Sequence, residues 1–159
     1  MKLFTIGVYG STEDSFFNVL KDNGIDTFCD IRQRRGVRGN QYSYVNSNYL
    51  QTKLKELDIR YIYEKNLAPT NEIRQKQKDE DKRTGMDKKH RAELGSVFKA
   101  EYTKSILDAY DIVDFNNRLI DLGAKNVVFF CVEQFPKACH RSLVVARMAR
   151  LFDHEVKHL

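Results

Sequence analysis

Residues 127–150, VVFFCVEQFPKACHRSLVVARMAR, contain the stretch that decides the fold. The first six residues are β-branched, aromatic or sulfur-containing, which predicts a buried strand over 127–132. A loop with Pro136 follows, and apolar spacing predicts a helix from about Arg141 to Phe152. In open α/β sheets, ligands bind at the carboxyl edge of the strands, beside the amino ends of the following helices. We therefore expect a site between this strand and this helix.

The rest of the chain alternates between strand-like and helix-like segments. Further strands are predicted at 2–6, 25–31, 59–63 and 156–159, and further helices from Ser11 or Thr12 to Gly24, from Asn46 or Ser47 to about Leu57, and over 98–122. In the last of these helices the expected inward positions are Tyr102, Ile106, Tyr110, Val113 and Leu119. The alternation predicts one domain over 1–159 with a three-layer, Rossmann-like α/β fold, a mostly parallel sheet with helices on both faces.

One segment departs from this pattern. Residues 71–91, NEIRQKQKDEDKRTGMDKKHR, have mixed charge and little apolar periodicity. This composition predicts a mobile loop or an exposed helix inserted into the domain. A lid over the site and an arm that follows nucleic acid are the functional alternatives.

Composition limits the class of protein. The 159 residues are 42% hydrophobic, which is enough for a core, and the three cysteines are expected to be reduced thiols. No apolar run reaches the roughly 18–20 residues that span a membrane, and the first residues do not resemble a signal peptide. We expect a cytoplasmic protein without membrane contact. The net charge of +5 favours an anionic partner, either a small molecule or a nucleic acid, but also suits a merely soluble surface.

The candidate nucleophile is Cys139, which opens the last helix in the run Cys139-His140-Arg141-Ser142. A helix amino end and neighbouring cations stabilise a thiolate, which could then attack an electrophile. Alternatively these residues only cap the helix and hold loops. Cys131 is the competing thiol, although a buried cysteine at the end of a strand most often serves packing.

Acidic and basic side chains are expected to lie close to the Cys139 thiol. Glu133 and His140 are the candidate acid and base, and Glu133 could instead pair with Arg141 or a loop arginine. Asp30 and Arg32 end the second strand, so they reach the same crevice if that strand neighbours residues 127–132. Arginines there would bind phosphate or carboxylate, whereas the alternative is an ion-pair network that only orders loops.

A zinc site is weighed against this hypothesis. Cys131, Cys139 and His140 are suitable ligand types, but the seven residues between the cysteines match no common zinc pattern. Neither a P-loop nor a GxGxxG, GxSxG or HExxH motif occurs. We predict no metal and no cofactor.

Several short motifs together resemble the domain-of-unknown-function 488 family, DUF488. They are Thr5-Ile6-Gly7, Asp30-Ile31-Arg32, an arginine-bearing loop, Cys131-Val132-Glu133, Cys139-His140-Arg141 and the ending Val156-Lys157-His158-Leu159. The resemblance spans nearly the whole chain and implies a compact three-layer α/β domain. It places the family's pattern on Asp30, Arg32, Arg38, Cys131, Glu133, Cys139, His140 and Arg141. Arg35 and Val37 stand where a proline and a serine are common in the family, and the charged insertion is a further departure. A weaker similarity, to rhodanese domains, concerns the fold alone.

The leading hypothesis is an anion-binding, candidate catalytic crevice. Arg32, Arg38 and Arg141 would bind the anion, Cys139 would be the nucleophile, and Glu133 or His140 would be the acid or base, with Asp30 and Cys131 in support. The rival hypothesis is a non-catalytic nucleic-acid-binding protein that uses the same arginines, Tyr42, Tyr44 and the 71–91 segment. A third is an assembly partner whose polar cluster is structural.

Overall fold

The computed structural model of the protein describes residues 1–86 and 91–159. Its centre is a five-stranded sheet in the order β3-β2-β4-β1-β5, in which every pairing is parallel. The strands are β1 (Lys2–Ile6), β2 (Thr27–Asp30), β3 (Arg60–Tyr63), β4 (Asn126–Phe130) and β5 (Glu155–His158). This arrangement confirms the predicted α/β fold class.

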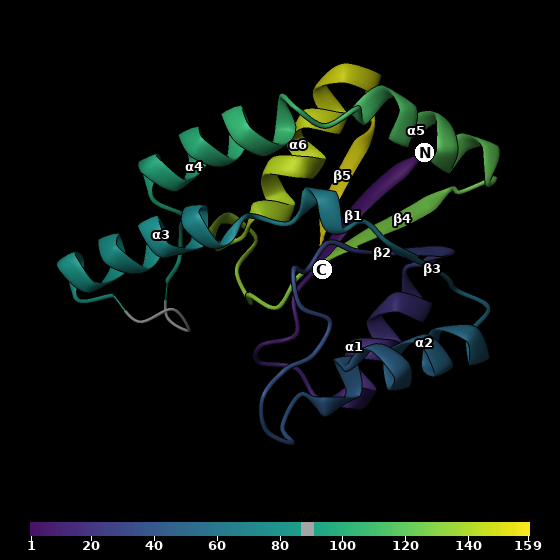
Figure 1. Cartoon of the computed structure of the whole chain (residues 1–159). Helices are drawn as coiled ribbons and strands as arrows, with labels where there is room; N and C mark the ends of the chain where they lie inside the picture. Colours follow the sequence, from purple (N-terminus) through teal and green to yellow (C-terminus); the bar gives the residue numbers. More distant parts are fainter. Residues whose placement is uncertain (87–90) are drawn as a thin grey trace.

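Helices cover both faces of the sheet (Figure 1). On one face lie α1 (Glu13–Asp22) and α2 (Ser47–Glu56), and on the other lie α4 (Ser96–Tyr102), α5 (Ile112–Asp121) and α6 (His140–Phe152). Successive strand residues point to opposite faces, so Val127 and Phe129 enter one core while Val128 and Phe130 enter the other. Because β4 is central and buried on both faces, it reads as a continuous apolar run.

The connections that follow β1 and β4 lead to helices on opposite faces of the sheet. The chain leaves β1 for α1 on one face, and it leaves β4 for α6 on the other. Adjacent strands whose connections diverge in this way form a topological switch point, where a crevice opens at the carboxyl edge. The two loops stay in contact there, since the backbone N–H groups of Val8 and Tyr9 donate to the carbonyl of Val132 at 3.2 and 3.1 Å.

The predicted helix over 98–122 is divided in the structure. A π-helical turn, Thr103–Leu107, follows α4, and α5 begins at a new cap where the Asp111 side chain accepts from the N–H of Asp114 at 2.9 Å. This restart turns the helix faces, so Tyr102 and Leu119 are buried as expected, whereas Val113 is 53% exposed. The inward position predicted for Val113 is therefore wrong.

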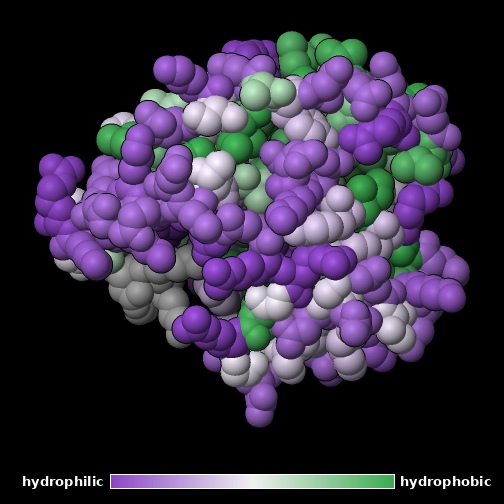
Figure 2. Space-filling model, in the orientation of Figure 1, coloured by the Kyte–Doolittle hydropathy of each residue, from purple (hydrophilic) through white to green (hydrophobic). Residues whose placement is uncertain are grey.

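The charged segment forms α3 (Asn71–Thr84). Of the two predictions for this segment, a mobile loop or a helix, the structure therefore has the helix as far as Thr84. Ile73, Gln77 and Asp81 recur every fourth residue and are buried, and Arg91 beyond the helix is buried as well. The outward face of α3 is hydrophilic, as Figure 2 shows on its left side. Residues 87–90 of the predicted insertion lie outside the described residues. Among the helices that the structure describes, none combines the length and the apolar character needed to cross a membrane.

Candidate functional site

A pocket of about 700 Å³ opens at the carboxyl edge of the sheet. Its walls come from the loops that follow β1, β2 and β4, from α3, and from the start of α6. Arg32, Cys131 and Cys139 all line it, which places the ends of two neighbouring strands and the start of a helix around one space. The expected convergence of the β2 and β4 ends therefore occurs.

Arg32 is held in the pocket wall by an ion pair with Asp30 and by a contact with an aromatic ring. Its Nε and Nη2 donate to the two carboxylate oxygens of Asp30 at 2.9 and 2.7 Å, and its guanidinium lies 4.6 Å from the centre of the Phe130 ring. Asp30 also accepts from the Tyr61 hydroxyl at 2.9 Å. Arg32 is only 3% exposed, yet its Nη1 has no hydrogen-bond partner among the residues that the structure describes. A buried donor of this kind costs free energy unless a partner satisfies it, so it calls for an acceptor from the pocket.

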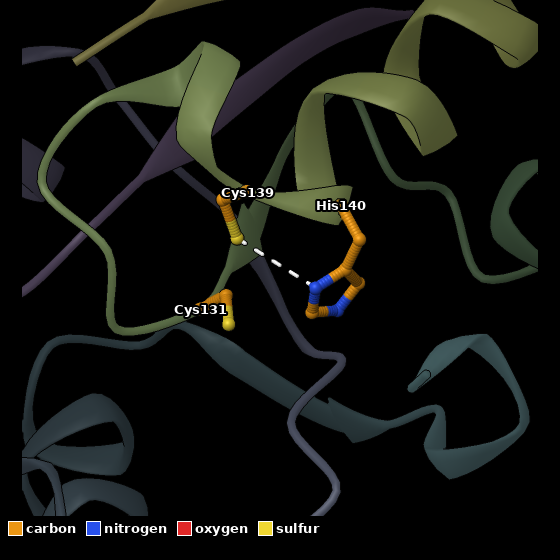
Figure 3. A group of neighbouring side chains, drawn as sticks. All are labelled: Cys131, Cys139 and His140. Atoms are coloured by element: carbon orange, nitrogen blue, oxygen red, sulfur yellow. Dashed lines mark hydrogen bonds between the residues drawn. The ribbon is translucent and has the colours of Figure 1, made fainter. Parts of the chain in front are cut away.

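Cys139 and His140 meet at the start of α6. Figure 3 shows the Cys139 thiol directed at the His140 ring, and the distance from Cys139 Sγ to His140 Nδ1 is 3.7 Å. His140 Nε2 lies 3.1 Å from the carbonyl oxygen of Ile31, and the Tyr102 ring packs against the imidazole with 5.4 Å between ring centres. Because a carbonyl only accepts, Nε2 is assigned as the protonated nitrogen, which leaves Nδ1 to face the thiol. The arrangement is a thiol, a base and a group that orients the base.

The environment favours the thiolate of Cys139. Burial raises its pKa, but hydrogen bonds from the Cys131 thiol and from the Arg141 backbone N–H, together with the Arg141 charge, outweigh burial and lower the pKa to about 7. The pKa of Cys131 is raised, first by the same hydrogen bond and then by burial. Burial also raises the pKa of Cys29, which lies inside β2 and not in the pocket. The three thiols are therefore chemically distinct.

Glu133 lines the pocket and pairs with an arginine that sequence reasoning did not consider. Arg91 Nη2 lies 4.0 Å from Glu133 Oε1, while Arg91 Nη1 donates to Asp81 Oδ2 at 2.6 Å. Arg91 Nη2 also donates to the carbonyl of Ala138 at 3.3 Å. These contacts join the segment after α3 to the loop between β4 and α6.

Arg141 has a different position from the other predicted anion ligands. It is fully buried, and its Nη1 and Nη2 donate to the backbone carbonyls of Glu133 and Gln134 at 2.6 and 3.0 Å. It is not among the residues that line the pocket. The Arg141 guanidinium therefore braces the loop between β4 and α6, and does so through the Glu133 backbone and not its carboxylate.

Positive charge dominates the pocket wall. Among the described residues that line the pocket, the arginines and lysine are Arg32, Arg34, Arg38, Arg74, Arg91 and Lys78, whereas the carboxylates are Asp81 and Glu133. Both carboxylates contact Arg91, and Arg32 is neutralised by Asp30. The side chains of Arg34 and Arg38 are exposed on the loop after β2. The excess cations can thus face a ligand from the pocket mouth.

Three of the lining side chains could hold a metal ion. The ligand atoms of Cys131, Cys139 and His140 all lie within 4.8 Å of one another. One of these side chains follows the end of β4 and the other two stand at the start of α6, so the loop between these elements separates them in the sequence. Their spacing therefore resembles no common zinc pattern.

Sequence reasoning found one half of the pocket and missed the other. The structure brings Arg32, Arg38, Cys131, Glu133, Cys139 and His140 to one space, with Asp30 behind Arg32. The missed lining residues include Tyr9 and, from the charged segment, Arg74, Gln77, Lys78, Asp81 and Arg91. The spacing of Ile73, Gln77 and Asp81, four residues apart, was the signal in the sequence that could have found this side of the pocket, because residues at this spacing share one face of a helix.

A protein-family model described as Domain of unknown function DUF488 matches residues 12–148. The chain belongs to the DUF488 family. The matched range includes β2, β3, β4 and the first two thirds of α6, so the DUF488 match covers Arg32, Cys131 and Cys139. Neither the comparison with curated proteins nor that with solved structures found a match. Membership of DUF488 names no reaction, so function has to be argued from the geometry of the pocket.

Proposed function

We propose that the pocket binds an anionic substrate and that the Cys139 thiol attacks it. The observation that carries the proposal is the Arg32 guanidinium in the wall of the pocket that also holds Cys139. It is buried and fixed by Asp30, and its Nη1 has no partner within residues 1–86 and 91–159. Phosphate and carboxylate oxygens are the acceptors that best suit such a donor. The proposed substrate therefore carries a phosphate or carboxylate group.

Fixing Arg32 before the ligand arrives favours binding. Two of its nitrogens are already engaged by Asp30 and its plane rests on Phe130, so little side-chain entropy is lost when Nη1 takes a ligand oxygen. Arg38 is exposed at the pocket mouth and can supply a second donor. In this proposal Arg141, predicted as a third anion ligand, instead holds the loop that positions Cys139.

The chemistry would follow the thiol and imidazole arrangement. His140 Nδ1 takes the proton of the Cys139 thiol, and Sγ then forms a bond to the electrophilic carbon or phosphorus of the substrate. The leaving group departs with the electron pair of the broken bond and receives the proton from His140. Water then attacks the covalent intermediate, and Glu133 or His140 accepts its proton. The bond to Sγ breaks with its electron pair on sulfur, and the base returns the proton to Sγ, which restores the thiol.

The nucleic-acid hypothesis is less well supported by the same geometry. Tyr44, which this hypothesis uses, is only 6% exposed, and its hydroxyl donates to the carbonyl of Ser11 at 3.0 Å. Tyr42 lines the pocket and packs against Tyr9 with 5.3 Å between ring centres. An extended strand of bases would need several accessible rings in a row.

Thermal unfolding with phosphate and with sulfate tests the anion site. At roughly 100 times the dissociation constant, a ligand that binds only the native state adds about 2.7 kcal/mol to the free energy of unfolding. For a chain of this size we expect the Tm to rise by roughly 5–10 °C. Arg38→Ala should lose most of this shift, and Arg150→Ala, which removes an exposed arginine outside the pocket, should keep it.

Arg32→Lys is the sharper variant, since it keeps a cation beside Asp30 but removes Nη1. Arg32→Ala is less informative, because it leaves the Asp30 carboxylate buried without its ion-pair partner. The anion site is contradicted if phosphate and sulfate give no shift, or if Arg38→Ala and Arg150→Ala respond alike. Stabilisation by oligonucleotides alone, lost at high salt, would favour the nucleic-acid hypothesis instead.

A further inference from the structure

We propose that Cys131 Sγ, Cys139 Sγ and His140 Nδ1 together bind one Zn²⁺ ion, and that the bound ion blocks the Cys139 thiol. Zinc binding is inferred from these three side chains alone. The blocking effect rests on the proposed function, because it requires Cys139 to be the nucleophile.

The distances suit a tetrahedral ion. With Zn–S near 2.3 Å and Zn–N near 2.0 Å, a tetrahedral site separates sulfur from nitrogen by about 3.5 Å and sulfur from sulfur by about 3.8 Å. Cys139 Sγ lies 3.7 Å from His140 Nδ1, and no two of the three ligand atoms are more than 4.8 Å apart. Figure 3 shows the three side chains around one space, reached from the end of β4 and the start of α6. The separations are therefore within about 1 Å of those in a tetrahedral site.

His140 is already oriented as a metal ligand. Metal-bound imidazoles usually donate the other ring N–H to a carbonyl or carboxylate, which fixes the ring and the tautomer. Here Nε2 lies 3.1 Å from the carbonyl oxygen of Ile31, and Tyr102 packs against the ring. The lone pair of Nδ1 is therefore directed toward the two thiols.

Charge balance also favours a thiophilic dication. Each thiol releases its proton to solvent on binding, so two thiolates and Zn²⁺ form a neutral unit that the neighbouring Arg141 does not repel. Two sulfurs and one imidazole suit Zn²⁺ better than Mg²⁺ or Ca²⁺, which prefer oxygen. All three residues line the pocket, so the fourth coordination position opens toward its arginines and can take water or an anion.

Equilibrium dialysis against Zn²⁺ tests the site in the full chain, after treatment with a chelator and a reductant. We expect one zinc per chain, and Co²⁺ in its place should give a thiolate-to-cobalt charge-transfer band and the intense visible bands of a tetrahedral ion. Cys131→Ser, Cys139→Ser and His140→Ala should each weaken zinc binding at least tenfold. Cys29→Ala, which removes the thiol outside the pocket, should bind zinc like the wild type.

The inference is overturned if the wild type retains no zinc, or if the cobalt spectrum lacks the charge-transfer band. It is also overturned if Cys131→Ser and Cys139→Ser bind as tightly as Cys29→Ala. Saturating Zn²⁺ should slow alkylation of Cys139 at least tenfold, and a chelator should restore it; unchanged alkylation in the zinc-loaded protein removes the blocking effect. The proposed function fails separately, since it predicts anion binding and Cys139 reactivity in the metal-free protein.

Discussion

At the scale of single residues, the pocket depends on side chains that brace backbone as much as on those that face a ligand. Arg141 holds two carbonyls of the loop between β4 and α6, and Gly7 lets the loop after β1 approach it. A Cβ at Gly7 would stand 1.9 Å from the carbonyl oxygen of Glu133 and 3.2 Å from Arg141 Nη2. The glycine is therefore required by this close approach and not by its backbone conformation.

Gly7→Ala should destabilise the protein because the Glu133 carbonyl and the Arg141 guanidinium have to move together. We expect a loss of roughly 2–4 kcal/mol in the free energy of unfolding, measured by urea denaturation. Gly36→Ala is the matched control, since its new Cβ would meet only Asn46 Oδ1 at an ordinary 3.6 Å. Equal stabilities of the two variants would show that the contact between the loops is not tight.

At the scale of elements, α3 is joined to the pocket by buried polar contacts. Gln77 donates to Asp81 at 2.7 Å and accepts from the Gly95 N–H at 3.0 Å, while Asp81 binds Arg91. Arg91 in turn reaches Ala138 and Glu133 on the far side of the pocket. The position of α3 is thus coupled to the loop that precedes Cys139.

Asp81→Asn should loosen this connection, because the largely buried Arg91 loses the nearer of its two ionised partners and keeps only Glu133, at 4.0 Å. We expect the free energy of unfolding to fall by about 1–3 kcal/mol and the amides of α3 to exchange hydrogen faster than the amides of α6. Asp79→Asn changes the same residue type on the exposed face of α3 and should leave both quantities close to those of the wild type. If the two variants exchange alike, α3 is not held by the Asp81–Arg91 pair.

The elements also show how far the sequence could predict this structure. Buried parallel strands need continuous apolar runs, so β4 and its helix α6 could be read directly from residues 127–150. The restart of the helix at Asp111 was not predicted, because apolar spacing continues across the break and only the cap at Asp111 marks it. The face of α3 that lines the pocket was missed because it is polar, and polar side chains are buried there only through partners distant in the sequence.

The candidate site was predicted to a similar extent. Strand ends that share one sheet edge bring Arg32 and Cys139 together, and this follows from the order of strands and helices. The burial of Arg141 against carbonyls depends on how one loop closes, which composition does not determine. The close approach of Cys131 to Cys139 and His140 could not be predicted either, since the spacing of these residues in the sequence matches no known ligand set.

At the scale of the whole molecule, part of the positive charge behind the net charge of +5 is concentrated at one place on the surface. Cationic side chains from three separate stretches of the chain gather around the pocket that contains the Cys139 thiol. A cleft lined by one sign of charge concentrates ions of the opposite sign and raises their rate of association, by a factor of about 10 to 1,000 in strongly charged cases. An anionic reagent should therefore reach Cys139 more readily than a neutral reagent of the same shape.

The most direct measurement compares alkylation of each cysteine by iodoacetate and by iodoacetamide, followed by mass spectrometry on reduced, metal-free protein. At neutral pH Cys139, which is 2% exposed but lines the pocket, should be labelled before Cys29, which is 0% exposed inside β2 and outside the pocket. The ratio of the iodoacetate rate to the iodoacetamide rate should be about tenfold higher at Cys139 than for free cysteine. Sulfate or Arg38→Ala should lower this ratio, and Arg150→Ala should not. A ratio equal to that of free cysteine, or equal labelling of Cys139 and Cys29, would contradict an anion pocket built around a reactive Cys139.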